Sequence, residues 1–153
     1  GRRTPDANQN LKGAIIGLNL STDAPKIFRV LVEATAFGGK AIVDRLASEG
    51  VVIDQVIAMG GITQKNPFVM QVIADVLNMP IKVTASEQTC ALGAAIFGTV
   101  AAGVYSSVAL AQEKMGSGFS QVFSPYQENV IKYQRLYQEY LALGNNIEKH
   151  FTK

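Results

Sequence analysis

Residues suited to ligand binding lie near the middle of the chain, where a β-branched run ends in two glycines. Residues 56–77 read VIAMGGITQKNPFVMQVIADVL, so Gly60 and Gly61 follow the run directly and Asn66 precedes a proline. Glycine has no side chain, which lets a flat ligand approach the backbone closely. An Asn-Pro pair is typical of a helix start, which offers free amides and a positive dipole end. The pattern indicates a ligand site at this turn.

A purely structural role is the alternative for the same residues. Strand-to-helix turns use glycine freely, and an asparagine at a helix start caps a free amide with its side chain. Both roles can coexist at Asn66. The sequence contains neither GxGxxG nor the phosphate loop GxxxxGK[ST]. These absences argue against a dinucleotide-dependent dehydrogenase and against a P-loop enzyme.

The elements that must position this turn alternate between β-like and helical runs. Residues 11–22 are apolar and β-compatible, which predicts a strand. Apolar residues then recur at helical spacing, so a helix should run from about Asp23 to about Ser48. The short β-branched run over 51–59 predicts a buried, parallel strand.

After the glycine turn, the same alternation continues. Asn66 and Pro67 should open a second helix that Pro80 stops. Residues 81–84 predict a third strand, and Thr89 is a candidate cap for a third helix rich in small residues. The order of elements predicts an α/β architecture with right-handed crossovers.

The C-terminal third is predicted to be mainly helical. A short helix should begin at Ser106 or Ser107 and end before Gly116, and residues 117–124 are expected to form a loop. Pro125 should lead into a long helix. Its aromatic stripe is interpreted as core packing and consists of Val130, Tyr133, Tyr137, Tyr140 and Leu141.

Composition excludes several classes of partner. The chain has 153 residues, 48% hydrophobic and 17% charged, as expected for one globular domain. Fourteen Lys and Arg residues face twelve Asp and Glu residues, and these charges form no basic stripe for nucleic acid. The most apolar stretch, 91–105, is too short and too rich in glycine and alanine to cross a membrane. We therefore expect no nucleic-acid partner and no membrane partner.

The start of the chain and its cysteine content suggest a context. The sequence begins GRRTPDANQN, with no initiator Met and no secretory signal, and we interpret it as the continuation of a longer protein. One cysteine, Cys90, allows no internal disulfide, which fits a reducing compartment. We therefore expect a cytoplasmic protein.

Other polar or reactive residues are expected to have structural roles. Glu33 lies in an apolar helical face, where a buried carboxylate needs a hydrogen-bond partner. Cys90 is expected to be a small packed residue, and Asp75 and Glu87 are expected to be surface or capping charges. His150 lies in a polar tail. The sequence thus assigns no catalytic residue and no metal ligand.

Taken together, the motifs resemble a known family. MGGITQKNPFVMQVIADVLNMPIKV followed by ALGAAIFGTVAAGVY is similar to the C-terminal domain of the FGGY carbohydrate kinases, which belong to the actin-like ATPase superfamily. The segments LKGAIIGLNLST and IFRVLVEATAFGGKAIVDRL precede them in the family's order. The resemblance is close over residues 1 to about 105. It implies a partial actin-like (ribonuclease H-like) domain, with a mixed sheet flanked by helices.

The resemblance implies a role for the glycine turn. In these kinases ATP lies in a cleft between two domains, and this segment is the adenosine loop. Gly60 and Gly61 would let the backbone lie against the nucleotide, and Asn66 would form a hydrogen bond near the adenine. Lys65 is the competing position, because loop length varies between subgroups.

The resemblance also implies what residues 1–153 lack. They would form the C-terminal nucleotide-binding domain, without the N-terminal sugar-binding domain and without the start of this domain. The carboxylate base, most Mg²⁺ contacts and the first phosphate-binding turn would lie outside the chain. We therefore expect the chain alone to bind ATP weakly and to phosphorylate no sugar.

Within the family, the segments EATAFG, GGITQKNP and SEQTCALGAAIFG most resemble a pentose-kinase subgroup, and this resemblance implies L-ribulose as the sugar. Xylulose or glycerol kinases of the same family are the alternatives, as is a non-catalytic nucleotide-binding or assembly module of the superfamily. The implied partners are ATP and a sugar. A homodimer is also expected to be possible, because missing strands would leave a sheet edge unpaired.

Overall fold

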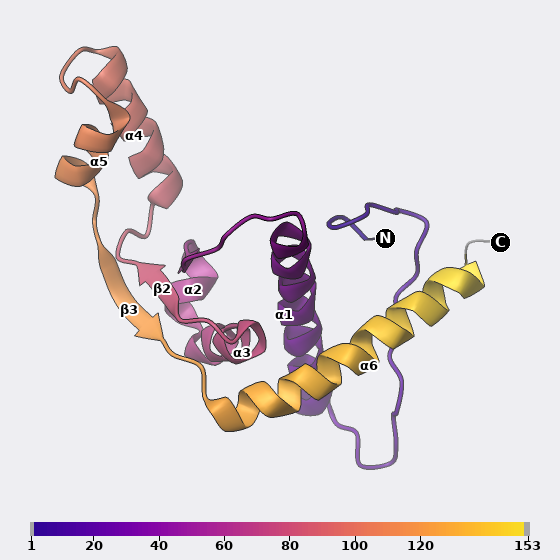
Figure 1. Ribbon diagram of the computed structural model, residues 1–153. Helices are drawn as coiled ribbons and strands as arrows, with labels where there is room; N and C mark the ends of the chain where they lie inside the picture. Colours follow the sequence, from indigo (N-terminus) through magenta and orange to yellow (C-terminus); the bar gives the residue numbers. More distant parts are fainter. Residues whose placement is uncertain (1, 152–153) are drawn as a thin grey trace.

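The computed structural model describes residues 2–151, which form a mixed sheet packed against long helices. In chain order the elements are α1 (Ala24–Ser48), β1 (Val56–Ala58), α2 (Gly61–Lys65), α3 (Pro67–Leu77), β2 (Ile81–Thr84), α4 (Thr89–Ala101), α5 (Val108–Met115), β3 (Phe119–Phe123) and α6 (Gln127–Phe151). Figure 1 shows α6 starting below α3 and crossing in front of the lower part of α1, while α4 and α5 project together away from the other helices. None of the described helices is both long enough and apolar enough to cross a membrane.

The sheet has the strand order β1-β2-β3. β1 and β2 are parallel, with Val56 opposite Ile81 and Ala58 opposite Val83, and α3 lies between them in the chain. β3 pairs antiparallel with the other side of β2, and the register shifts between Val83 and Thr84. The predicted mixed sheet with flanking helices is therefore confirmed.

Side-chain caps explain why three of the helices begin where the sequence predicts. Asp23 accepts a hydrogen bond from the Lys26 amide at 3.0 Å at the start of α1. Ser107 accepts one from the Leu110 amide at 3.2 Å at the start of α5. Asn66 caps α3 in the same way. The predicted cap at Thr89 is wrong, because Gln88 holds the cap position and makes no side-chain capping bond.

Two predictions about strands are also wrong. Residues 11–22 form no strand, and Leu20 in this segment is fully exposed. A strand requires a partner to complete its ladder of hydrogen bonds, and no described strand lies beside this segment. Conversely, the predicted loop over 117–124 contains β3, because Phe119–Phe123 pairs with the side of β2 that β1 does not occupy.

The predicted strand over 51–59 is confirmed only in its second half, and the prediction that it is buried is wrong, because Ile57 is exposed and Val56 and Ala58 are only half-buried. β1 covers Val56–Ala58, whereas Val52 is 81% exposed outside any strand. β2 has only four residues, Ile81–Thr84, so the sheet offers few pairing positions to a longer partner. The length of the neighbouring strand therefore limits β1 more than its own β-branched residues do.

α3 is buried on two sides and divides the core into two clusters. Toward α1 and α6 it presents Val72 and Val76, which pack with Phe37 and Tyr133. Toward the sheet it presents a second set, which packs with β2 and β3. The members of the sheet-side cluster are Val69, Met70, Ala74, Ile81, Val83 and Phe123.

The aromatic stripe of α6 is core packing, as predicted. The Phe37 ring of α1 lies 6.1 Å from the Tyr133 ring centroid, 5.7 Å from that of Tyr137 and 5.4 Å from that of Tyr140. Tilted and edge-on aromatic pairs at such separations add stabilisation beyond the burial of area. This aromatic cluster fixes where α6 crosses α1.

Polar groups at the same interface are paired. The Glu33 carboxylate accepts hydrogen bonds from Arg29 at 2.8 Å and from the Tyr133 hydroxyl at 3.1 Å, which confirms the predicted structural role of Glu33. Burial raises the pKa of Tyr133. Burial, followed by the nearby Asp44 carboxylate, raises the pKa of Tyr137 to about 12.

The prediction that Asp75 is a surface or capping charge is half wrong. Its side chain is buried, with the residue only 2% exposed. It accepts hydrogen bonds from Gln71 Nε2, the Tyr126 amide and Asn129 Nδ2, each at 2.8 Å. Asp75 therefore caps another helix, since it anchors the first turn of α6 to α3.

The expectation that Cys90 is packed is wrong. Cys90 is exposed on α4, and Phe97 on the same helix is 64% exposed. Among its described residues α4 buries only Ile96, and its main contact is with α5. An apolar helix normally has partners on most sides, so α4 lacks the neighbours that its sequence suits.

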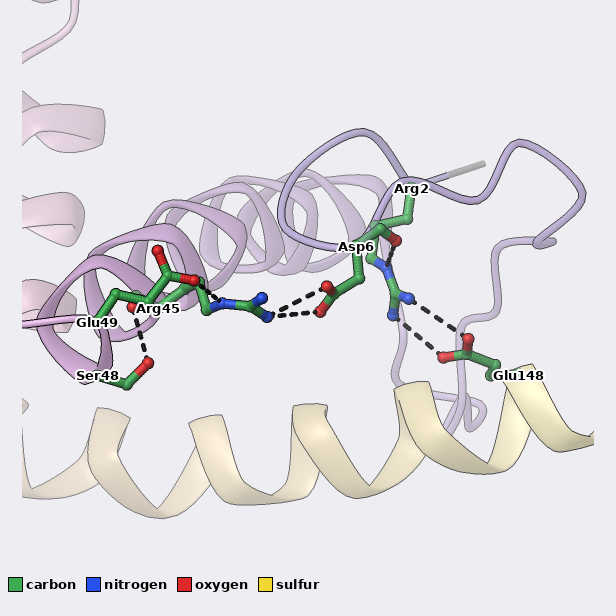
Figure 2. Close-up of polar contacts among 6 residues, drawn as sticks. All are labelled: Arg2, Asp6, Arg45, Ser48, Glu49 and Glu148. Carbon is green, nitrogen blue, oxygen red and sulfur yellow. Dashed lines mark hydrogen bonds and ion pairs between the residues drawn. The ribbon is translucent and has the colours of Figure 1, made fainter.

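The N-terminal loop is held against the helices by ion pairs (Figure 2). The Arg2 guanidinium donates to the Glu148 carboxylate of α6 at 3.1 and 3.4 Å. Arg45, near the end of α1, donates to both carboxylate oxygens of Asp6 at 3.1 and 3.2 Å. Partly exposed pairs of this kind each contribute about 0–1 kcal/mol, so they orient the loop more than they stabilise the fold.

Replacing Asp75 tests the anchor of α6. Asp75→Ala should lower the free energy of unfolding by about 3 kcal/mol, because it leaves buried donors without an acceptor. Urea denaturation followed by circular dichroism would measure the change. Asp54→Ala removes an exposed carboxylate and should change stability by less than about 0.5 kcal/mol. Equal losses in the two variants would contradict the anchoring role.

Alkaline unfolding tests the raised pKa of Tyr137. Its folded pKa of about 12 exceeds the ordinary tyrosine value of about 10, so the unfolded state loses the proton first. The stability that this group contributes is complete below about pH 10 and is lost as pH rises toward about 12. Tyr137→Phe should therefore show a shallower fall in unfolding free energy over this range than the exposed control Tyr126→Phe.

Candidate functional site

A groove lies where the chain leaves β1 and β2. The two strands are parallel, so their carboxyl ends meet at one edge of the sheet, which is where open α/β sheets bind ligands. The groove has a volume of about 340 Å³, within the range of small-molecule sites. Its lining residues are Gly61, Gln64, Lys65, Glu87 and Gln88.

Gly60 makes the turn from β1 into α2 possible. Its backbone adopts φ 98° and ψ 170°, a region that is essentially restricted to glycine. A Cβ atom at this position would meet nothing within 4 Å, so the requirement is conformational rather than steric. Its carbonyl accepts hydrogen bonds from the Thr63 amide at 3.1 Å and the Thr63 hydroxyl at 2.7 Å. These bonds fix the first turn of α2, and Gly61 lies exposed beside the groove.

Asn66 lies at the junction of α2 and α3. Its backbone amide donates to the Ile62 carbonyl at 3.1 Å, and its side-chain oxygen accepts from the Val69 amide at 3.3 Å. Asn66 therefore caps α3, which is the structural role that the sequence offered as the alternative. Of the four candidates from the sequence, Gly61 and Lys65 line the groove, whereas Gly60 and Asn66 are not among its lining residues.

The opposite wall is the β2–α4 turn, residues 85–88, which sequence reasoning did not assign to a site. The Gln64 carboxamide reaches across to it and donates to the carbonyl oxygens of Thr84 at 3.1 Å and Ser86 at 3.3 Å. Glu87, expected to be a surface or capping charge, is exposed and lines the groove. The predicted parallel pairing of the two strands could have identified this wall from the sequence, because the turns that follow parallel strands lie at the same sheet edge.

The lining carries one charge of each sign. Lys65 and Glu87 are both exposed, and neither forms an ion pair with the residues that the structure describes. An exposed ammonium group suits the anionic or polar part of a ligand, and a carboxylate suits hydroxyl or amine donors. Within residues 2–150, no cluster of three or more His, Cys, Asp or Glu side chains could hold a metal ion.

Comparison with known proteins places the chain in a family. The C-terminal domain of the FGGY family of carbohydrate kinases matches residues 1–102. The chain is 52% identical over 150 residues to the ribulokinase of Vibrio parahaemolyticus. The aligned region covers 97% of the chain and 26% of that relative. The chain therefore belongs to the FGGY family of carbohydrate kinases, as predicted, and ribulokinases are among its relatives.

Solved structures share the fold. A ligand-bound xylulose kinase from Lactobacillus acidophilus superposes with a TM-score of 0.84 at 23% identity, over 97% of this chain and 30% of that one. A Plasmodium falciparum glycerol kinase with ADP gives 0.73 at 23% identity, over 100% of this chain and 29% of that one. The chain thus spans about a quarter of the length of the curated relatives that it matches.

The two glycines of the turn provide a matched test of its geometry. Gly60→Ala should lower the free energy of unfolding by about 1–3 kcal/mol, because alanine is strained at φ 98°. Gly61→Ala lies in the first turn of α2 with open space around its Cβ atom, so it should be neutral or stabilise by up to about 1 kcal/mol. Thermal unfolding of both variants measures the difference. Equal effects would show that the turn does not depend on the Gly60 backbone.

Proposed function

We propose that this chain holds ATP in a kinase that transfers the γ-phosphate to L-ribulose. The observation that carries the proposal is the groove at the Gly-Gly turn, in a chain 52% identical to a ribulokinase over 150 residues. The glycerol kinase with ADP supports a nucleotide as the ligand of this fold. Identity to the solved xylulose kinase is only 23%, which favours ribulose over the xylulose and glycerol alternatives.

In this proposal Gly60 and Gly61 bring the backbone against the adenosine. Lys65 is the stronger of the two candidate side-chain contacts, because its ammonium group lines the groove and has no ion-pair partner among residues 2–150. The side-chain oxygen of Asn66 is engaged by Val69, which leaves its amide group as the alternative donor toward the ligand.

The proposal assigns Mg²⁺ largely to groups outside this chain. Mg²⁺ is usually held by one or two carboxylates together with phosphate oxygens, and it neutralises phosphate charge during transfer. Glu87 is the only carboxylate in the groove lining, so the chain offers at most part of such a site. The general base and the sugar pocket are assigned to the remaining three quarters of the enzyme. The chain alone would then transfer no phosphate and bind ATP with millimolar or weaker affinity.

The proposal includes a cytoplasmic location, where ATP is supplied, and it leaves room for a homodimer. Apolar side chains in the segment 15–20 and on α4 are exposed and could be covered by another chain. A non-catalytic assembly module is the weaker alternative, because the identity to ribulokinases extends over 94–97% of the chain.

Titration with ATP tests the proposed site. Amide signals of residues 60–65 and 85–88 should shift in NMR spectra with a millimolar or weaker dissociation constant. Lys65→Ala should raise that constant by about three- to tenfold, because one charge-assisted contact contributes about 1 kcal/mol. Asn66→Ala should mainly lower the unfolding free energy by about 1 kcal/mol through loss of the cap.

Two results would overturn the assignment. Shifts that avoid the groove residues would remove ATP from this site, and a larger affinity loss in Asn66→Ala would make Asn66 the contact instead of Lys65. The same sample with ATP, Mg²⁺ and L-ribulose should release no ADP above background. Measurable turnover by the pure chain would contradict the assignment of the base to another part of the enzyme.

A further inference from the structure

The two walls of the groove are joined by one side chain. Gln64 belongs to α2, and its carboxamide nitrogen donates to the carbonyl oxygens of Thr84 and Ser86 at 3.1 and 3.3 Å. These partners are 20 and 22 residues away in the sequence. Among the described residues, they are the only hydrogen bonds that connect α2 to the end of β2 and to the β2–α4 turn that follows it. Gln64 is therefore a bridge between separate segments rather than part of a local turn.

The chemistry of this bridge requires a side-chain nitrogen that carries at least two N–H donors, which the carboxamide of Gln64 provides. Both acceptors are backbone carbonyl oxygens, so the side chain must supply two N–H donors from one atom. Neither a carboxylate nor an apolar side chain can do so. Lys65 follows Gln64 directly, and Glu87 follows Ser86 directly. The two ends of the bridge are thus the sequence neighbours of the two charged residues of the groove.

Contacts within the β2–α4 turn do not replace the bridge. The Thr89 hydroxyl donates to the Ser86 carbonyl at 3.1 Å, and the Gln88 amide donates to the Ser86 hydroxyl at 3.2 Å. Both bonds hold the turn in its own shape. The Ala85 amide donates to the Gly118 carbonyl at 3.0 Å, on the β3 side and away from α2. The pairing of β1 with β2 brings the two turns to one sheet edge. Within the described residues, Gln64 then makes the only direct hydrogen bond between α2 and the β2–α4 turn.

We propose that Gln64 is a positioning residue for the nucleotide: its carboxamide holds the β2–α4 turn at the distance from α2 at which Lys65 and Glu87 can contact one ligand together. The inference rests on the proposed function, because it assigns the ligand of this groove to ATP. Gln64 acts on the ligand through the two walls. Loss of the bridge should widen the groove and weaken ATP binding while the core, formed by α1, α3, α6 and the sheet, remains folded.

The test uses Gln64→Met, which keeps the length of the side chain and removes both donors. Gln134→Met makes the same change on the exposed side of α6 and is the matched control. In Gln64→Met, amide hydrogen exchange of residues 85–88 should become about tenfold faster, and the dissociation constant for ATP should rise by about three- to tenfold. In the full-length kinase that carries this chain, KM for ATP should rise while KM for the sugar and kcat change little.

A second pair of variants separates the bridge from the charge of the groove. Gln64→Glu places a carboxylate against two carbonyl oxygens, and Gln88→Glu adds the same charge to the lining without touching the bridge. The inference requires the larger rise in the dissociation constant, and faster exchange in residues 85–88, in Gln64→Glu. This pair also tests the inference if Gln64→Met folds poorly.

The possible results distinguish this inference from the proposed function. If the wild-type chain shows no ATP-dependent shifts in the groove, the proposed function fails, and the inference fails with it. If the wild-type chain binds ATP there and both Gln64 variants bind it equally well, the inference alone is overturned. Unchanged exchange of residues 85–88 in Gln64→Met would likewise refute the bridge, with or without ATP.

Discussion

The burial of α3 on two sides is the constraint on which the rest of the structure depends. One face packs on β2 and β3 through Met70 and Ala74, and the other packs on α1 and α6 through Val72 and Val76. A helix held on both sides cannot rotate or slide without opening both clusters. Because Asn66 ends α2 and caps the start of α3, the placement of α3 also fixes α2, the turn at Gly60 and the Lys65 side of the groove.

The groove combines this rigid base with a lightly held wall. On the α2 side, the backbone of Gly60 and the cap at Asn66 are determined by the packed helix behind them. On the other side, the turn of residues 85–88 leads into α4, which packs chiefly on α5 and otherwise faces solvent. Gln64 is the point at which the two walls meet.

Elements governed by local chemistry could be predicted from the sequence, and elements governed by partners could not. The caps at Asp23, Asn66 and Ser107 predicted the starts of three helices, and the spacing of the tyrosines predicted the buried face of α6. By contrast, residues 11–22 have β-branched and apolar residues but no neighbour, and β3 exists because β2 offers a free side. The same division applies to the candidate site. The glycine turn and Lys65 could be identified from one continuous segment. Gln64, Glu87 and Gln88 could not be assigned to the groove from the sequence, because they come together only when β1 and β2 pair.

The extended segment ahead of α1 has a practical consequence. Ile16 is 68% and Leu20 108% exposed, so apolar side chains that usually drive folding remain in contact with water here. In the isolated chain, this segment would favour precipitation at high concentration, since exposed apolar stretches readily associate with one another. Solubility, rather than the stability of the helical core, would then limit how concentrated a sample of the isolated chain can become.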